Sequence, residues 1–151
     1  MQNAIAKFTA GVVVLGALSV SPASANGWEV WTEKQSADKV TVVASFGGDG
    51  SIEEAQLDLK VSGPFEVLEV STLRKGSICF GNAEKNVLRA VPPSGAGSAL
   101  KAAMTDTCMF TLRVLSPKGW SAEGIVDVGF KECASSVKGV VGCEAKFQVV
   151  E

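Results

Sequence analysis

The chain has 151 residues, with 14 lysines and arginines against 16 aspartates and glutamates, which gives a formal net charge of −2 at pH 7. The charges are scattered and form no basic stripe of the kind that follows a phosphate backbone, so nucleic acid is not an expected partner. The chain contains no histidine. A Ser-His-Asp triad is therefore impossible, and a cysteine nucleophile would lack its usual base.

The first 25 residues have the features of a bacterial export signal. Lys7 precedes an apolar run over residues 8–20, which is followed by the small-x-small sequence Ala23-Ser24-Ala25. The run is shorter than the roughly 20 residues that a membrane-spanning helix needs. We therefore expect residues 1–25 to be a Sec-type signal peptide, and residues 26–151 to be a single domain, periplasmic or secreted, that is not inserted in the membrane. Cleavage would leave 13 basic and 16 acidic residues, a net charge of −3.

Apolar and polar residues alternate along much of the mature chain, and this period of two predicts β-strands with one buried face. The alternation is clearest in AQLDLKV, residues 55–61, and in TCMFTLRVL, residues 107–115. In IVDVGF we expect Val126, Val128 and Phe130 to share the apolar face. Further strands are expected in residues 27–33, 40–46, 66–70, 86–91 and 143–150. In the last of these the expected apolar face consists of Cys143, Ala145, Phe147 and Val149.

Gly- and Pro-rich turns separate these strands at spacings of roughly ten residues. The turns lie at residues 47–51, 62–64, 74–77, 92–98 and 116–119. ALKAAM, residues 99–104, is the one stretch in which we expect a helical turn. Short strands with regular turns predict an all-β fold, namely an antiparallel two-sheet β-sandwich of the jelly-roll type with about 8–9 strands.

The mature part contains four cysteines: Cys79, Cys108, Cys133 and Cys143. An even number of cysteines in an exported chain predicts two disulfides. Because there is no CxxC pair and no histidine, we expect neither a metal site nor a catalytic thiol, and no cofactor. Four cysteines allow three pairings. Sequence separation favours Cys133 with Cys143, 10 residues apart, which leaves Cys79 with Cys108, 29 apart.

Four stretches carry a family resemblance. They are residues 40–71, from VTVVASF through AQLDLKV to EVLEVS, then NVLRAV with the later TCMFTLRVL, and finally CEAKFQVV. Their order resembles the cohesin domain, the jelly-roll sandwich of bacterial cellulose-degrading assemblies, and its carbohydrate-binding-module relatives. The resemblance covers most of residues 38–150 and implies a cohesin-like fold and a binding role. A typical cohesin is one module of a larger protein and docks a calcium-binding dockerin. We expect this chain to be a single module with two disulfides, unlike a typical cohesin, so we carry over no docking residue.

Acidic residues are the first candidates for catalysis. Glu53, Glu54, Asp58, Glu66 and Glu69 are close in sequence. The last three fall on the polar face of their strands, where carboxylates are usually solvated, so we do not expect a glycosidase pair. GGDG, residues 47–50, has the glycines of an anion-binding loop, but it joins two strands with no helix behind it and is interpreted as a tight turn. Its single carboxylate, Asp49, is too few for a calcium site.

Exposed tryptophan rings would indicate carbohydrate binding, because an aromatic ring offers an apolar face and a polar edge. The chain has Trp28, Trp31 and Trp120 and no tyrosine. Trp28 and Trp31 lie on opposite faces of one expected strand, and Trp120 follows the SPKG turn. Trp31 and Trp120 are therefore the possible ligand-binding residues. The other interpretation is that these rings cover the ends of the sandwich.

The sequence thus predicts an exported, disulfide-bonded β-sandwich without enzymatic activity. The first hypothesis is a protein-binding module that docks another envelope or secreted protein through a sheet face or edge. The second is a carbohydrate-binding module that holds a polysaccharide on Trp31 and Trp120.

Overall fold

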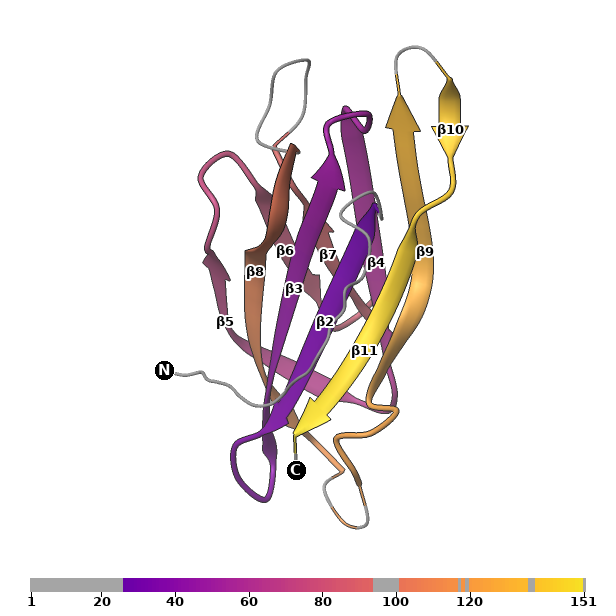
Figure 1. Ribbon diagram of the computed structural model, residues 1–151. Coiled ribbons are helices and arrows are strands. Elements are labelled where there is room, and N and C mark those ends of the chain that lie inside the picture. The colour runs from indigo at the N-terminus through magenta and orange to yellow at the C-terminus, as the bar shows by residue number, and fades with distance from the viewer. Residues whose placement is uncertain (1–25, 94–100, 117, 119, 136–137, 151) are drawn as a thin grey trace.

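The computed structural model describes residues 26–93, 101–116, 118, 120–135 and 138–150. The predicted signal peptide, residues 1–25, lies outside the described residues. Two five-stranded sheets pack face to face (Figure 1), so the predicted β-sandwich is confirmed. Among the described residues there is no helix long and apolar enough to cross a membrane.

Each sheet is named after one of its inner strands. The β3 sheet has the strand order β11–β2–β3–β8–β5, and the β9 sheet has the order β10–β9–β4–β7–β6. The strands of the β3 sheet are β11 (Glu144–Val150), β2 (Gly27–Lys34), β3 (Lys39–Asp49), β8 (Lys101–Val114) and β5 (Phe65–Thr72). The strands of the β9 sheet are β10 (Gly139–Val141), β9 (Val126–Ser135), β4 (Glu54–Val61), β7 (Val87–Val91) and β6 (Ile78–Asn82).

The structure differs from the sequence prediction in three details. It describes ten strands instead of eight or nine, because Ile78–Asn82 forms the strand β6 and the loop between Cys133 and Cys143 contains the three-residue strand β10. The strands β11 and β2 run parallel, whereas the other paired strands are antiparallel. The predicted helical turn in ALKAAM is wrong for residues 101–104, which begin β8. There Lys101 and Ala102 pair with the end of β3, so sheet pairing overrides the helix propensity of alanine.

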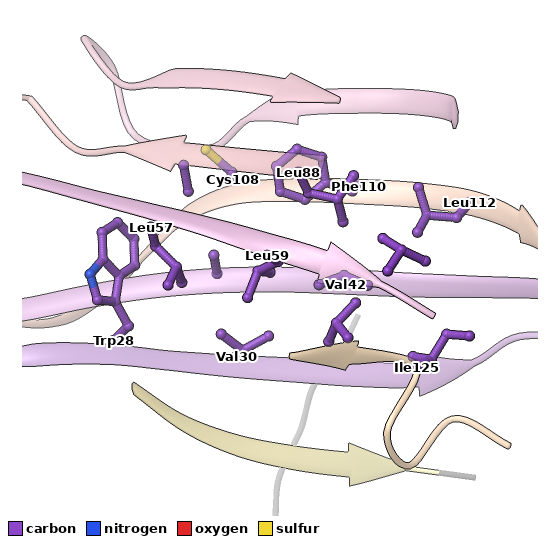
Figure 2. Close-up of a cluster of buried hydrophobic side chains, with 14 of the residues drawn as sticks. Trp28, Val30, Val42, Leu57, Leu59, Leu88, Cys108, Phe110, Leu112 and Ile125 are labelled. Atoms are coloured by element: carbon purple, nitrogen blue, oxygen red, sulfur yellow. The ribbon is translucent and has the colours of Figure 1, made fainter. Parts of the chain in front are cut away.

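The core lies between the sheets and is built from the predicted alternation. In β4, every second residue from Ala55 to Val61 is at most 5% exposed. In β8, Cys108, Phe110 and Leu112 are fully buried. Figure 2 shows these side chains pointing from both sheets into one apolar layer. The indole of Trp28 packs edge-on against Phe46 with ring centroids 4.9 Å apart, so this tryptophan is a core residue.

The two predicted disulfides form with the favoured pairing, and they join the sheets on opposite flanks of the sandwich. Cys79 of β6 is bonded to Cys108 of β8. Cys133 of β9 is bonded to Cys143, which directly precedes β11. Strands β6 and β8 lie toward one side of the two sheets, and β9 and β11 toward the other. Cys108 therefore shares the phase of core residues because its sulfur ties the two sheets together.

Two β-bulges change which face a residue occupies. In β9 the register with β4 shifts between Asp58 and Leu59, so that Gly129 is the extra residue. In β5 a shift after Val67 leaves Leu68 as the extra residue. A bulge inserts one unpaired residue and reverses the alternation beyond it. The prediction that Phe130 shares a face with Val128 is therefore wrong, because Phe130 pairs with Asp58 on the outer face of the β9 sheet.

Candidate functional site

A row of four side chains crosses the outer face of the β9 sheet. Phe80 of β6 is paired with Arg89 of β7, Arg89 with Asp58 of β4, and Asp58 with Phe130 of β9. Directly paired residues project from the same face of a sheet. The flanking residues Leu57, Leu59, Leu88 and Ala90 are buried in the core, so this row faces outward. We call these four residues the β9-sheet row.

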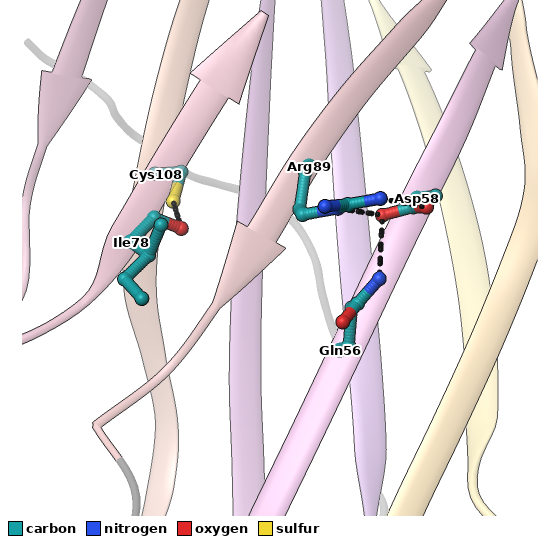
Figure 3. Close-up of polar contacts among 5 residues, drawn as sticks. All are labelled: Gln56, Asp58, Ile78, Arg89 and Cys108. Atoms are coloured by element: carbon teal, nitrogen blue, oxygen red, sulfur yellow. Dashed lines mark hydrogen bonds and ion pairs between the residues drawn. The ribbon is translucent and has the colours of Figure 1, made fainter.

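The centre of the β9-sheet row is an ion pair. Arg89 Nε and Nη2 donate hydrogen bonds of 2.8 and 3.0 Å to the two carboxylate oxygens of Asp58, and Gln56 Nε2 donates a third of 3.1 Å (Figure 3). Asp58 is only 9% exposed, although it lies on an outer face. The hydrogen bond to Asp58 and its negative charge raise the pKa of Arg89 above its ordinary value. The pair is thus held rigidly in one bidentate arrangement.

Exposed apolar side chains surround this ion pair. Phe80 is 45% exposed and Phe130 is 46% exposed, one at each end of the row. Ile78, in the same phase of β6 as Phe80, is 60% exposed. Val140 of β10, beside Ala134, is 70% exposed. Aromatic rings around a central arginine are the composition that distinguishes protein interfaces from the rest of a protein surface.

The outer face of the β3 sheet is different. Its middle row contains Trp31 of β2, between Gln148 of β11 and Val43 of β3. Trp31 and Val43 are half-buried by their neighbours on the strands. The nearby Arg113 donates a 2.9 Å hydrogen bond to the exposed Glu66. The apolar residues Trp31 and Val43 on this face are thus less exposed than Phe80 and Phe130 on the outer face of the β9 sheet.

Trp120 lies at an end of the sandwich, where its indole is held by contacts with other residues of the chain. Its indole Nε1 donates a 2.6 Å hydrogen bond to the carbonyl oxygen of Ala37, in the loop between β2 and β3. Lys34 Nζ lies 4.6 Å from the ring centroid, which is a cation–π contact. The ring also packs against the core. The structure does not bring Trp31 and Trp120 together, since Trp31 projects from the outer face of β2.

The other acidic candidates are placed apart. Glu66 is paired with Arg113, and Asp58 is held by Arg89. In the glycine-rich turn, Asp49 accepts a 2.8 Å hydrogen bond from the backbone N–H of Ser51, and Gly50 has a φ of 92°. Hydrogen bonds from Ser51, first its hydroxyl and then its backbone N–H, lower the pKa of Asp49. Across the described part of the chain, no group of three His, Cys, Asp or Glu residues is arranged to hold a metal ion.

Sequence reasoning proposed none of the four residues in the β9-sheet row as a candidate for binding, since Asp58 was considered only as a catalytic carboxylate. Phe80, Arg89 and Phe130 gave no motif, and only the pairing register of four strands brings them together. One signal was available for Phe130. Gly129 interrupts an otherwise regular strand, and a glycine inside a strand pattern often marks a bulge.

The sequence by itself identifies no relative. No protein-family model matches it. No curated protein matches it either. The class of the protein therefore rests on the structure, which is a two-sheet β-sandwich of the jelly-roll type.

Comparison with solved structures identifies the type of β-sandwich more specifically. A non-cellulosomal cohesin from the archaeon Archaeoglobus fulgidus matches with a TM-score of 0.57 and 14% sequence identity, over 85% of this chain and 93% of that one. A cohesin module from a family 33 glycoside hydrolase of Clostridium perfringens matches with a TM-score of 0.52 and 12% identity, over 83% and 98%. A chain of a type II cohesin–X-dockerin complex from Acetivibrio cellulolyticus matches with a TM-score of 0.50 and 8% identity, over 83% and 96%. The chain has a cohesin-like fold, as the order of its strands predicted.

Proposed function

We propose that this protein is an exported, non-enzymatic docking module that binds another envelope or secreted protein through the outer face of the β9 sheet. The observation that carries the proposal is the β9-sheet row, in which two exposed phenylalanines flank the ion pair between Arg89 and the nearly buried Asp58. Two disulfides between the sheets support the oxidising compartment that export implies. The similarity to a chain of a cohesin–X-dockerin complex is consistent with a protein partner.

The chemistry of the row fits a protein partner. Interface energy concentrates in a few aromatic and arginine side chains near the centre of a patch, while the surrounding contacts exclude water. Phe80 and Phe130 would supply apolar area, and their rigid rings lose little conformational entropy on binding. Arg89 is held by Asp58, so its free N–H groups keep a fixed direction. A partner that covers the row would therefore meet a preorganised surface.

The test uses a double variant and a control matched in residue type and exposure. Phe80→Ala/Phe130→Ala removes both rings of the row. Phe147→Ala removes a ring that is 36% exposed on β11, in the other sheet. The unaltered protein is first used to capture partners from the envelope and secretome. Each captured partner is then identified, purified and titrated against the unaltered protein and each variant. Loss of a hot-spot ring costs about 2 kcal/mol, or about 30-fold in Kd, so we expect the double variant to weaken binding at least that much. Phe147→Ala should bind as the unaltered protein does. Equal binding by the double variant would reject the face.

Carbohydrate binding is the second candidate function. It is supported by a groove of about 360 Å³ beside Trp120, lined also by Ser62, Ser121 and Glu123. The hydroxyl groups and the carboxylate offer hydrogen bonds to a sugar, and the half-buried indole of Trp120 offers an apolar surface beside them. Retention on immobilised polysaccharides should then fall in Trp120→Ala. Because Trp31 lies on another surface, Trp31→Ala tests it separately as a second stacking residue.

A further inference from the structure

The turn between β5 and β6 buries Arg74, whose guanidinium Nη1 has no hydrogen-bond partner among the described residues. This turn lies at the upper left of Figure 1. Arg74 is 8% exposed, and its Nη1 makes no hydrogen bond. Ser77, in the same turn, has a buried hydroxyl oxygen that also lacks a partner. The backbone is well fixed, since Ser77 N–H donates a 3.0 Å bond to Arg74 O, and Leu73 N–H donates one of 3.0 Å to Thr107 O.

The other two arginines of the chain show how unusual this is. Arg89 is bound to Asp58 and Arg113 to Glu66, and the side chains of both arginines are 43% exposed. Arg74 is the most buried of the three arginines, and among the described residues no carboxylate pairs with it. Burial lowers the pKa of Arg74, with no neighbouring negative charge to offset it. A guanidinium does not lose its proton in a protein, so a buried one requires a compensating group.

We propose that Arg74 and Ser77 form a binding site for an oxyanion at the β5–β6 turn. A guanidinium presents paired N–H donors that match the oxygens of a carboxylate, sulfate or phosphate group. The Ser77 hydroxyl adds one further donor from the same turn. The site satisfies two of the three buried side-chain atoms that lack a hydrogen-bond partner in the described part of the chain, the third being Trp28 Nε1 in the core. It does not depend on the docking function proposed above. The ligand is a free anion or the acidic group of a larger molecule.

The experiment measures the thermal stability of the purified protein in sodium phosphate, sodium sulfate and sodium acetate. Each salt is titrated against sodium chloride at equal ionic strength, which removes general screening. A ligand that binds only the folded state raises Tm in a saturable way. We expect such a rise with at least one of the three anions. A response to acetate would indicate a carboxylate ligand, and a response to phosphate or sulfate alone would indicate a tetrahedral oxyanion.

Three variants assign the response to the site. Arg74→Met should abolish the saturable rise, and Ser77→Ala should reduce it. Lys75→Met removes the exposed cation next to Arg74 and should keep the full rise. If Arg74→Met does not fold, Ser77→Ala and calorimetric titration of the unaltered protein with the responding anion decide the question. The proposal is overturned if the unaltered protein shows no saturable rise, if Ser77→Ala and Arg74→Met respond as it does, or if Lys75→Met loses the response equally.

Discussion

The two disulfides should stabilise the sandwich unequally, although both join the two sheets. Cys79 and Cys108 are separated by 29 residues, and Cys133 and Cys143 by 10. In the chain-entropy model, a cross-link restricts the unfolded chain more strongly when the loop that it closes is longer. The longer loop should therefore give the larger stabilisation.

The structure makes the two bonds a matched pair. Each joins one fully buried cysteine, Cys108 or Cys133, to one that is half-buried, Cys79 or Cys143. Replacing either pair by alanine thus removes similar packing, and the difference isolates the loop term. The model gives about 3.6 kcal/mol for the loop of 29 residues and about 2.7 kcal/mol for the loop of 10, a difference of about 0.9 kcal/mol.

Urea unfolding of Cys79→Ala/Cys108→Ala and Cys133→Ala/Cys143→Ala measures both values. Trp28 is 1% exposed in the core, so its fluorescence reports loss of the packing between the sheets. Both m-values should rise, because the unfolded chains become less compact. If Cys133→Ala/Cys143→Ala lost as much free energy of unfolding as Cys79→Ala/Cys108→Ala, or more, the loop argument would be refuted.

Three further changes test the packing and electrostatics of the fold. Arg89→Ala leaves the nearly buried carboxylate of Asp58 without its main partner and should lower the free energy of unfolding by about 1–3 kcal/mol. Arg113→Ala removes an exposed ion pair and should lower it by less than about 1 kcal/mol. Equal losses for the two variants in chemical denaturation would contradict this. Gly27→Ala places a Cβ against the carbonyl oxygen of Glu144 in the parallel partner strand, so we expect the free energy of unfolding to fall by about 1–3 kcal/mol, with a lower Tm. Gly63→Ala is the control for backbone strain alone, because a Cβ at Gly63 meets nothing within 4 Å while φ is +81°. Asp49 has a folded-state pKa below its ordinary 3.8, so its hydrogen bonds add stability above that pH and lose it as pH falls through the lowered value. The stability advantage over Asp49→Asn should therefore shrink as the pH is lowered below 3.8, and a constant difference would exclude this role.

The alternation of side chains was sufficient to predict the interior. In AQLDLKV the apolar residues are the buried ones, and in CMFTLRV the cysteine shares the face of Phe110 and Leu112. This works because a strand that is buried on one face must alternate, whatever its neighbours are. Alternation also separated the two tryptophans of β2 correctly, with Trp28 in the core.

Alternation does not tell whether a strand is central or at an edge. Phe147 and Val149 pair with Val30 and Thr32, which are buried, yet they are 36% and 38% exposed themselves. They lie on β11, the last strand of the β3 sheet, where no further strand covers them. Strand order depends on contacts between residues far apart in the sequence, so these exposures followed only from the structure.

The candidate binding face could not be predicted from the alternation either, because it depends on strand order and register. Its four residues come from four strands and meet only because β6, β7, β4 and β9 pair in one register. Phe130 reaches this face through the extra residue Gly129, without which it would keep the phase of Val128 and point into the core. The bulge thus converts a core-phased aromatic ring into a surface ring beside Asp58. A residue that breaks the alternation was therefore the most informative position for locating the candidate binding face, because regular alternation encodes the packing of the interior and its interruption places an apolar ring in water.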